Sequence, residues 1–188
     1  MTLDLHTPPA AGFDEPFEML HACHGRLQRM LALLGRLGEH LAAQGCDAQA
    51  RSAAADVQRY FDLAGPLHHE DEELHVLPAL RAAGEAALAD ALHAEHEAME
   101  QQWLSIRADL QAVQAQQLAG GEALAQARRR WAEFAALHAG HLQREESRAY
   151  PAVRARLGGA EQAAMGRDMA RRRGVRYPGG GLSRGGGV

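Results

Sequence analysis

Two stretches of the chain, HHEDEELHVLPALRA at residues 68–82 and HLQREESRAYPAVRA at residues 141–155, are versions of one another. Aligned with a shift of 73 residues, they are identical at His68/His141, Glu72/Glu145, Glu73/Glu146, Pro78/Pro151, Ala79/Ala152, Arg81/Arg154 and Ala82/Ala155. A second pair, LHACH at 20–24 and LHAEH at 92–96, matches at four of five positions with a shift of 72. Two copies of one helical hairpin, packed together, predict a bundle with approximate two-fold symmetry.

Apolar residues at helical spacing extend outward from these repeats and predict a long helix on either side of each. Good helix formers dominate the composition, while Val and Ile are scarce, so the expected class is all-α. Asp14 and Asp47 are expected N-caps, and Gly65-Pro66 is expected to kink the second helix. The helices are expected over about 14–45, 47–80, 88–120 and 122–157, in an up-down-up-down four-helix bundle.

The length of the chain suits one domain, and the composition of its C-terminal end differs from that of the rest. We predict the four-helix bundle over residues 13–158 and, over 159–188, a short helix followed by a flexible tail. The short helix is expected over residues 160–172. From Arg171 onward the sequence is rich in Arg and Gly and has little to bury, so we predict that this tail is disordered and assign it no function.

Composition also argues against two classes of partner. The net charge of −4 gives no broad basic face for nucleic acid, and no run approaches the roughly 20 apolar residues of a membrane span. The N-terminus carries an Asp and a His where a signal peptide would need a basic stretch and an apolar run, so we predict a cytoplasmic location. We leave a homodimer open.

The repeated histidines and glutamates carry the chemistry. In each copy a histidine precedes a glutamate by four residues, as in His68 and Glu72, so both side chains lie on the same face of a helix. A buried carboxylate costs several kcal/mol unless it is paired or binds a metal, and the predicted core offers no Lys or Arg there. We therefore predict a metal site, and imidazole with carboxylate suits iron, zinc or manganese. The predicted ligands are His24, His68, Glu72, His96, His141 and Glu145.

The other histidines of the eleven are interpreted differently. A lone histidine is more often a packed or surface residue than a ligand, so four are set aside: His6, His40, His69 and His75. Three more precede a predicted ligand by three residues, and the sequence leaves open whether one is a fifth histidine ligand, an outer hydrogen-bond donor or a polar group near the bundle end: His21, His93 and His138.

These residues together resemble the hemerythrin-like family, also called the HHE cation-binding domain. The resemblance covers about residues 13–157 and rests on His24, then His68-x-x-x-Glu72, then His96, then His141-x-x-x-Glu145. It implies a non-haem centre of two iron ions bridged by the two glutamates, with an open coordination position for dioxygen or another small oxidant. Reversible oxygen carriers of the family space two histidines as His-x-x-x-His on the third helix, whereas this chain has His93-x-x-His96, which puts oxygen carriage in doubt.

We therefore predict a di-iron binding protein that binds or senses dioxygen, nitric oxide or peroxide, a binding module more than an enzyme. One alternative is an iron-handling or oxidant-reducing enzyme linked to repair of iron–sulfur clusters. The relatives with that role usually carry an added N-terminal cysteine motif, which the segment before Phe13 lacks. A structural zinc bundle is the third interpretation.

Overall fold

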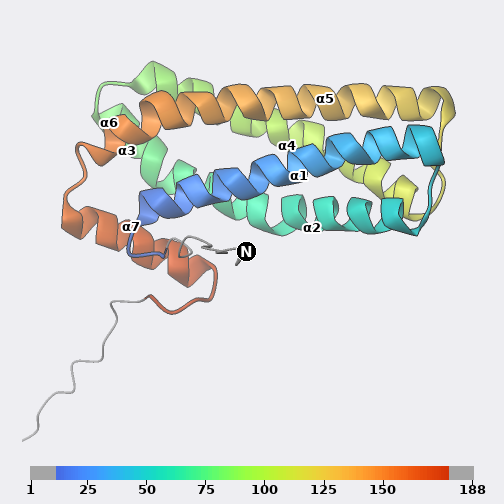
Figure 1. Ribbon diagram of the computed structural model, residues 1–188. Helices are drawn as coiled ribbons and strands as arrows, with labels where there is room; N and C mark the ends of the chain where they lie inside the picture. Colours follow the sequence, from blue (N-terminus) through green and yellow to red (C-terminus); the bar gives the residue numbers. More distant parts are fainter. Residues whose placement is uncertain (1–11, 178–188) are drawn as a thin grey trace, which may run out of the picture.

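The structure, a computed structural model of the 188-residue chain, describes residues 12–177 and is helical, with no strand in that part of the chain. Its long helices are α1 (Pro16–Gln44), α2 (Ala48–Asp71), α4 (Ala86–Gln114) and α5 (Gly121–Arg144). Both α1 and α4 pack against α2 and α5, which closes the four into a bundle. In Figure 1 the chain runs left to right along α1 and α4 and right to left along α2 and α5. The predicted all-α bundle is confirmed.

The helix ends follow local signals in the sequence, with one exception. The Asp47 carboxylate accepts a hydrogen bond of 2.8 Å from the backbone N–H of Ala50, so the predicted N-cap of α2 is confirmed. Gly45 ends α1 with a φ of 80°, a conformation that glycine adopts without steric cost. The predicted cap at Asp14 is wrong, because Glu15 holds the N-cap position of α1 and makes no side-chain capping bond.

Two π-helical turns interrupt the helices at equivalent points of the two repeats. The turns are η1 (Glu72–Val76) and η2 (Glu145–Ala149), and they lead into α3 (Leu77–Ala82) and α6 (Tyr150–Arg154). In η1 the N–H of Leu77 bonds to the carbonyl of Glu72, five residues back, and Tyr150 bonds to Glu145 in the same way. A proline follows each turn and cannot donate the N–H that a regular helix would use there. Each predicted ligand glutamate therefore begins a π turn.

The expected kink at Gly65-Pro66 falls inside one continuous helix and stays a prediction. The α2 helix continues through both residues to Asp71, with Pro66 inside it, and the departure from α geometry starts at Glu72. The fourth predicted helix is likewise divided by η2 and ends at Arg154.

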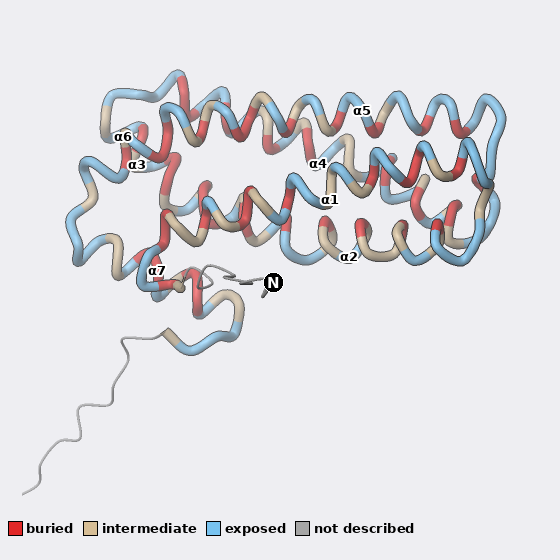
Figure 2. The backbone as a smooth tube through the Cα atoms, in the orientation of Figure 1, coloured by how far each residue is buried: buried red, intermediate tan, exposed pale blue. Residues whose placement is uncertain are grey.

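The apolar core forms two clusters separated by a polar layer. One cluster includes Leu27, Phe61 and Phe134, and the other includes Leu20 and Leu92, all of them buried. Figure 2 shows the buried positions recurring along the inward sides of the long helices. Between the clusters, histidines and glutamates replace apolar side chains on the same inward faces. No helix in residues 12–177 is both long and apolar enough to cross a membrane.

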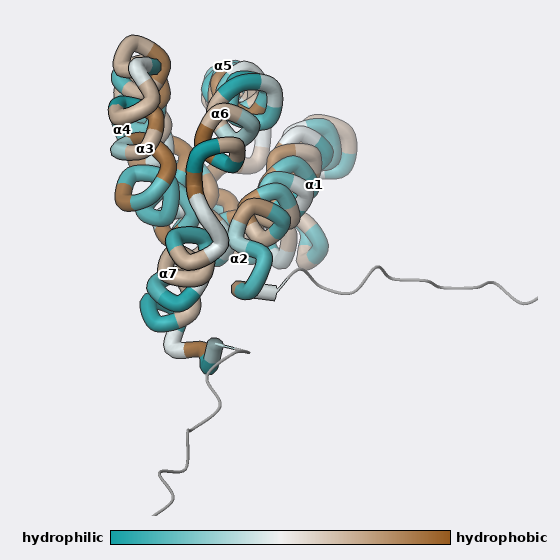
Figure 3. Tube along the Cα trace, turned by 90° about the vertical axis from the view of Figure 1, so that its left-hand side faces the viewer, coloured by the Kyte–Doolittle hydropathy of each residue, from teal (hydrophilic) through white to brown (hydrophobic). Residues whose placement is uncertain are grey.

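The last helix, α7 (Gly159–Arg172), lies outside the group of long helices, as the end-on view of Figure 3 shows. Its buried Met165 and Met169 belong to the cluster around Leu20 and Leu92. Arg172 and Arg173 each contact the buried carboxylate of Asp71 at 2.6 Å. The prediction of disorder from Arg171 onward is therefore wrong for these two arginines, because a buried acid on α2 pairs with both. The remainder of the predicted tail, 178–188, lies outside the described residues, and the predicted division at 158/159 remains a prediction.

Candidate metal centre

The six side chains predicted as ligands meet in the polar layer, and every one of them is buried. They come from six different elements: His24 from α1, His68 from α2, Glu72 from η1, His96 from α4, His141 from α5 and Glu145 from η2. Their donor atoms form two overlapping groups that share the two glutamates, and within each group the atoms lie within 4.8 Å of one another. Metal–ligand bonds of about 2.1 Å keep the donors around one ion within roughly 4 Å of each other, so each group is close to the size of a metal site.

The first group, called here the first metal position, consists of His24, His68, Glu72 and Glu145. The Nε2 atom of His24 lies 3.2 Å from a carboxylate oxygen of Glu145 and 3.9 Å from one of Glu72. The Nε2 atom of His68 lies 3.4 Å from the same Glu72 oxygen. Two imidazoles from α1 and α2 therefore face two carboxylates.

The second metal position consists of His96 and His141 with the same two glutamates. The Nε2 atom of His96 lies 3.4 Å from Glu72, and that of His141 lies 3.0 Å from Glu145. The two Nε2 atoms are only 3.1 Å apart. Without a metal, one of these nitrogens carries a proton and donates it to the other, and a cation bound to both would take the place of that proton.

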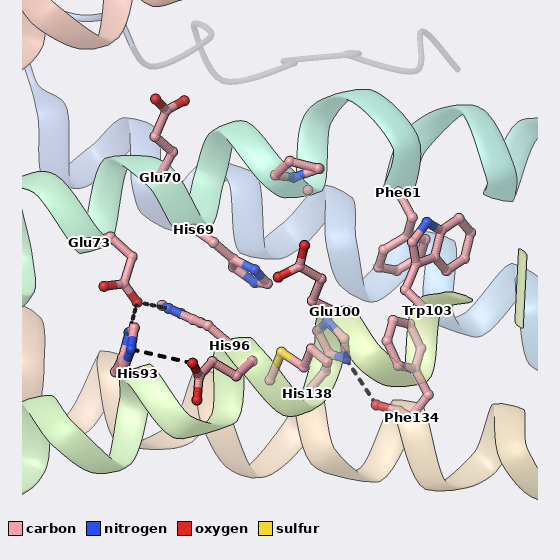
Figure 4. Close-up of a pocket in the computed structure, with 14 residues that line it drawn as sticks. Phe61, His69, Glu70, Glu73, His93, His96, Glu100, Trp103, Phe134 and His138 are labelled. Atoms are coloured by element: carbon pink, nitrogen blue, oxygen red, sulfur yellow. Dashed lines mark hydrogen bonds and ion pairs between the residues drawn. The ribbon is translucent and has the colours of Figure 1, made fainter. Parts of the chain in front are cut away.

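His69 joins the second metal position, although we predicted it to be an ordinary packed histidine. Its ring nitrogen lies within 4.8 Å of those of His96 and His141, and its ring stacks on His96 with centroids 4.3 Å apart (Figure 4). Adjacent residues on a helix point about 100° apart, which is why His69 does not share the face of His68. However, α2 packs against both α1 and α4, so both faces point inward. The signal available in the sequence was the His-His pair itself.

A carboxylate outside each metal position holds one histidine in a fixed orientation. The Nδ1–H of His24 donates to Glu146 at 2.6 Å, and that of His96 donates to Glu73 at 2.7 Å. Each of these carboxylates also accepts a second histidine, His21 at 2.8 Å and His93 at 2.9 Å, both of them exposed. Because Nδ1–H is donated outward, Nε2 is the nitrogen of the inner histidine that faces the centre, and it can bind a metal once its own proton has left.

The fifth-ligand candidates of the sequence are therefore placed elsewhere. His21 and His93 support the outer carboxylates and belong to neither metal position. The Nδ1–H of buried His138 donates to the backbone carbonyl of Phe134 at 2.9 Å, and this histidine also lies outside both groups. The structure brings His69 to the centre in their place.

The histidines on α2 and α5 differ in their outer partners. His141 donates its Nδ1–H to Glu95 at 2.8 Å, and Glu95 also pairs with Arg144. Neither ring nitrogen of His68 has a hydrogen-bond partner within residues 12–177. In the sequence repeat, Cys23 stands where the second copy has Glu95. The His68 ring therefore lacks the carboxylate that orients its counterpart.

Tyr150, the first residue of α6, completes the wall of the first metal position. Its buried hydroxyl donates to the carboxylate of Glu72 and lies 3.0 Å from Nε2 of His24, with the two rings stacked. The sequence did not predict this role for Tyr150, because a single tyrosine before a proline is not a recognisable motif. Its counterpart in the other repeat is Leu77, which has no polar group.

Burial and charge pull the ionisable groups of the centre in opposite directions. Burial alone lowers the pKa of His24, but hydrogen bonds to Glu145 and Glu72 outweigh it and raise the pKa to about 10. His68 lacks such bonds, and burial lowers its pKa to about 3. Burial raises the pKa of Glu145, and the neighbouring charge of Glu72 raises it further. The pKa of Glu72 lies well below its ordinary value, because the histidines around it outweigh burial.

Several buried atoms in this layer lack a hydrogen bond, which provides a test of whether a metal fits. They are both ring nitrogens of His68, Oε2 of Glu72 and both carboxylate oxygens of Glu145. Unsatisfied buried polar groups cost about 1–3 kcal/mol each, and more when charged. Imidazole nitrogens and carboxylate oxygens are common metal ligands, and these atoms belong to residues of the two donor groups. A pair of cations would therefore satisfy them together. The residues present fit such a group.

A bundle of long helices that holds histidines and glutamates in paired clusters defines a class of metal-binding helical proteins. Residues 15–153 match the family described as the Hemerythrin HHE cation binding domain, and the chain belongs to that family. It is also 32% identical over 109 residues to an uncharacterized protein of Haemophilus influenzae, a match that covers 57% of this chain and 63% of the relative. The chain thus spans less than two thirds of that relative's length. Family membership implies cation binding, with which the His/Glu clusters are compatible.

Proposed function

We propose that this protein holds two iron ions, one at each metal position, and uses them to bind or sense dioxygen, nitric oxide or peroxide. The observation that carries the proposal is the shared pair of buried glutamates, each with oxygen atoms near histidines of both positions. Carboxylates bridge paired metal ions in helical bundles, where the two ions lie about 3.5–4 Å apart. His24, His68, His96 and His141 are the proposed terminal ligands, and His69 is an additional one.

The two positions differ in the number of donors they offer. The first has two histidines with the two shared glutamates, whereas the second has His96 and His141 with the same glutamates and His69 close to both of those histidines. The smaller set leaves more of the coordination sphere to an outside ligand, so we assign the small oxidant to the first position, beside Tyr150. Bound iron would supply the electrons and the open coordination position, while the buried layer excludes bulk water. The Tyr150 hydroxyl is a protein O–H donor that contacts two of the proposed ligands of this position, His24 and Glu72.

Metal analysis and spectroscopy of the purified protein test this function directly. We expect about two irons per chain and an absorption band in the near ultraviolet from an oxygen-bridged iron pair, altered by dioxygen, nitric oxide or peroxide. His40 lies outside the centre, next to Asp47, so His40→Ala is the matched control and should keep both irons. Absence of bound metal after both aerobic and anaerobic preparation would contradict the proposal.

The same samples separate the alternatives. Sustained turnover of peroxide or nitric oxide, or transfer of iron to a metal-free iron–sulfur protein, would identify an enzyme or an iron-handling protein. A colourless protein with stoichiometric zinc would identify a structural bundle, and manganese would be recognised by the same metal analysis. Each of these metals accepts imidazole and carboxylate ligands, so the donor set alone does not choose among them.

A further inference from the structure

A cavity lies between α2 and α4, beside the second metal position (Figure 4). Its volume is about 390 Å³, within the range of roughly 300–1,000 Å³ that is usual for small-molecule sites. Dioxygen, nitric oxide and peroxide are close in size to water, whose share of the liquid is about 30 Å³. The cavity is therefore several times larger than these oxidants need, and it has room for an organic molecule.

The inner wall of the cavity is apolar and largely aromatic. Phe61 from α2 lies 5.0 Å from Trp103 and 5.2 Å from Phe134, measured between ring centroids, and Met99 lines the same wall. On the α2 side the wall includes Gly65, where a Cβ atom would meet only Phe61, at 3.6 Å. The missing side chain at Gly65 thus contributes to the open space. Flat aromatic walls favour a flat apolar ligand.

The mouth of the cavity is acidic. Its carboxylates are Glu70, Glu73, Glu97 and Glu100, and the lining includes no Lys or Arg. Glu73 is occupied by its two histidine partners, whereas no ion-pair partner is recorded for Glu100 within residues 12–177. In Figure 4 the Glu100 carboxylate extends between His69 and Trp103. An exposed carboxylate beside an aromatic wall attracts cations and repels anions.

At the inner end of the cavity, His138 also offers only an acceptor. Its Nδ1–H is donated to the carbonyl of Phe134, so Nε2 carries the lone pair, and burial keeps the ring neutral by lowering its pKa to about 4. His138 is 1% exposed, and no partner of Nε2 is recorded among the described residues. Both ends of the cavity thus present a hydrogen-bond acceptor, an exposed carboxylate at the mouth and a neutral imidazole nitrogen at the inner end, and both suit a ligand that carries a donor.

We propose that this cavity binds an organic cation, an amine carried on a flat apolar body. The body lies between Phe61, Trp103 and Phe134, and the ammonium group faces Glu100. Because His69 and His96 also line the cavity, the bound amine lies against the second metal position. This inference goes beyond the proposed function, which accounts for a small oxidant alone, and amine binding itself does not require iron.

Three probes of nearly equal size and different charge test the proposal: phenethylamine, 2-phenylethanol and phenylacetate. Affinities are measured by isothermal titration calorimetry and by the fluorescence of half-buried Trp103, on protein whose iron content is determined in the same sample. We expect phenethylamine to bind about tenfold more tightly than 2-phenylethanol, a difference of about 1.4 kcal/mol. Phenylacetate should bind most weakly, and added salt should reduce the preference for the amine.

Two variants locate the binding. Glu100→Gln should bring phenethylamine and 2-phenylethanol to within about twofold of each other, while Glu122→Gln, an exposed glutamate at the start of α5, should leave the preference unchanged. Gly65→Leu should fill the cavity and abolish binding of all three probes with the iron content and helical circular dichroism retained. Trp103→Phe should remove the fluorescence response but not the calorimetric signal.

Equal affinity for the three probes, no binding of the amine, or a preference that survives Glu100→Gln would overturn the proposal. These outcomes are independent of the proposed function, because they are read in protein that still contains iron. Conversely, a sample without metal that still prefers phenethylamine would contradict the di-iron function and support the amine site.

Discussion

The two candidate metal positions are built from repeated sequence, and three of the differences between the repeats change the side chains around them. His69 in the first repeat corresponds to Leu142 in the second, Leu77 corresponds to Tyr150, and Cys23 corresponds to Glu95. As a result, His69 lies beside the second position, where Glu95 accepts a hydrogen bond from His141. At the first position the Tyr150 hydroxyl is added, and His68 has no hydrogen-bond partner among the described residues. The repeat thus supplies the shared scaffold of the candidate centre, and the departures from it place more candidate donors at the second position than at the first.

The largest expected loss of iron comes from removing one of the two glutamates that both positions share. Glu72→Ala or Glu145→Ala takes a ligand from both, so we expect iron to fall from about two per chain to well below one. His24→Ala and His141→Ala each take a ligand from one position and should leave about one iron. Elemental analysis with circular dichroism, to verify folding, gives the result. Equal losses in all four variants would show that the glutamates are not shared.

Removing the extra histidine should make the positions more alike. His69→Leu copies the residue that the second repeat carries at Leu142. Because it removes a proposed ligand, it should weaken iron binding at the second position by about 100-fold, which is the largest loss usual for a residue that only supports a ligand. Competition against a chelator measures the affinity of each iron separately. The control is His75→Leu on η1, since His75 pairs with Asp168 away from the centre. A chelation curve unchanged by His69→Leu would remove His69 from the ligand set.

A smaller loss of iron affinity is expected when Glu95, the hydrogen-bond partner of His141, is changed. Glu95→Gln keeps the shape of the side chain but removes the charge that orients the imidazole, so the affinity of the second position should fall by about tenfold. The first position should be unaffected, because His68 has no such partner in the described residues. Exposed Glu133→Gln on α5 is the control. If both irons weakened together, the distinction between the positions would be lost.

The smallest effect is expected from the hydroxyl of the first position. Tyr150→Phe leaves the Glu72 carboxylate without its donor and should lower the free energy of unfolding by about 1 kcal/mol, measured by urea denaturation. Tyr60→Phe is the matched comparison, because its hydroxyl makes a long bond of 3.4 Å to the Cys23 carbonyl. A Tyr150→Phe variant no less stable than Tyr60→Phe would mean that the hydroxyl contributes nothing.

Sequence reasoning predicted the parts of the centre that depend on helical periodicity. All four predicted histidines fall on apolar faces, His68 and His141 stand four residues before a glutamate, and the structure brings all six predicted ligands together. It missed His69, because periodicity assigns one inward face to a helix, whereas α2 packs against two neighbours. It also did not predict the π turns that begin at Glu72 and Glu145. Contacts between distant segments, such as Arg173 with Asp71, have no local signal at all.

The π turns at Glu72 and Glu145 show what the two halves of the centre have in common. A π turn is an α-helix that holds one residue more than regular geometry allows, and such turns recur at functional sites. Both halves begin the π turn at the same register, at Glu72 and at Glu145, and a proline stands six residues after each glutamate. The extra residue is thus a property of the repeated unit, and it gives the two shared glutamates the same local backbone.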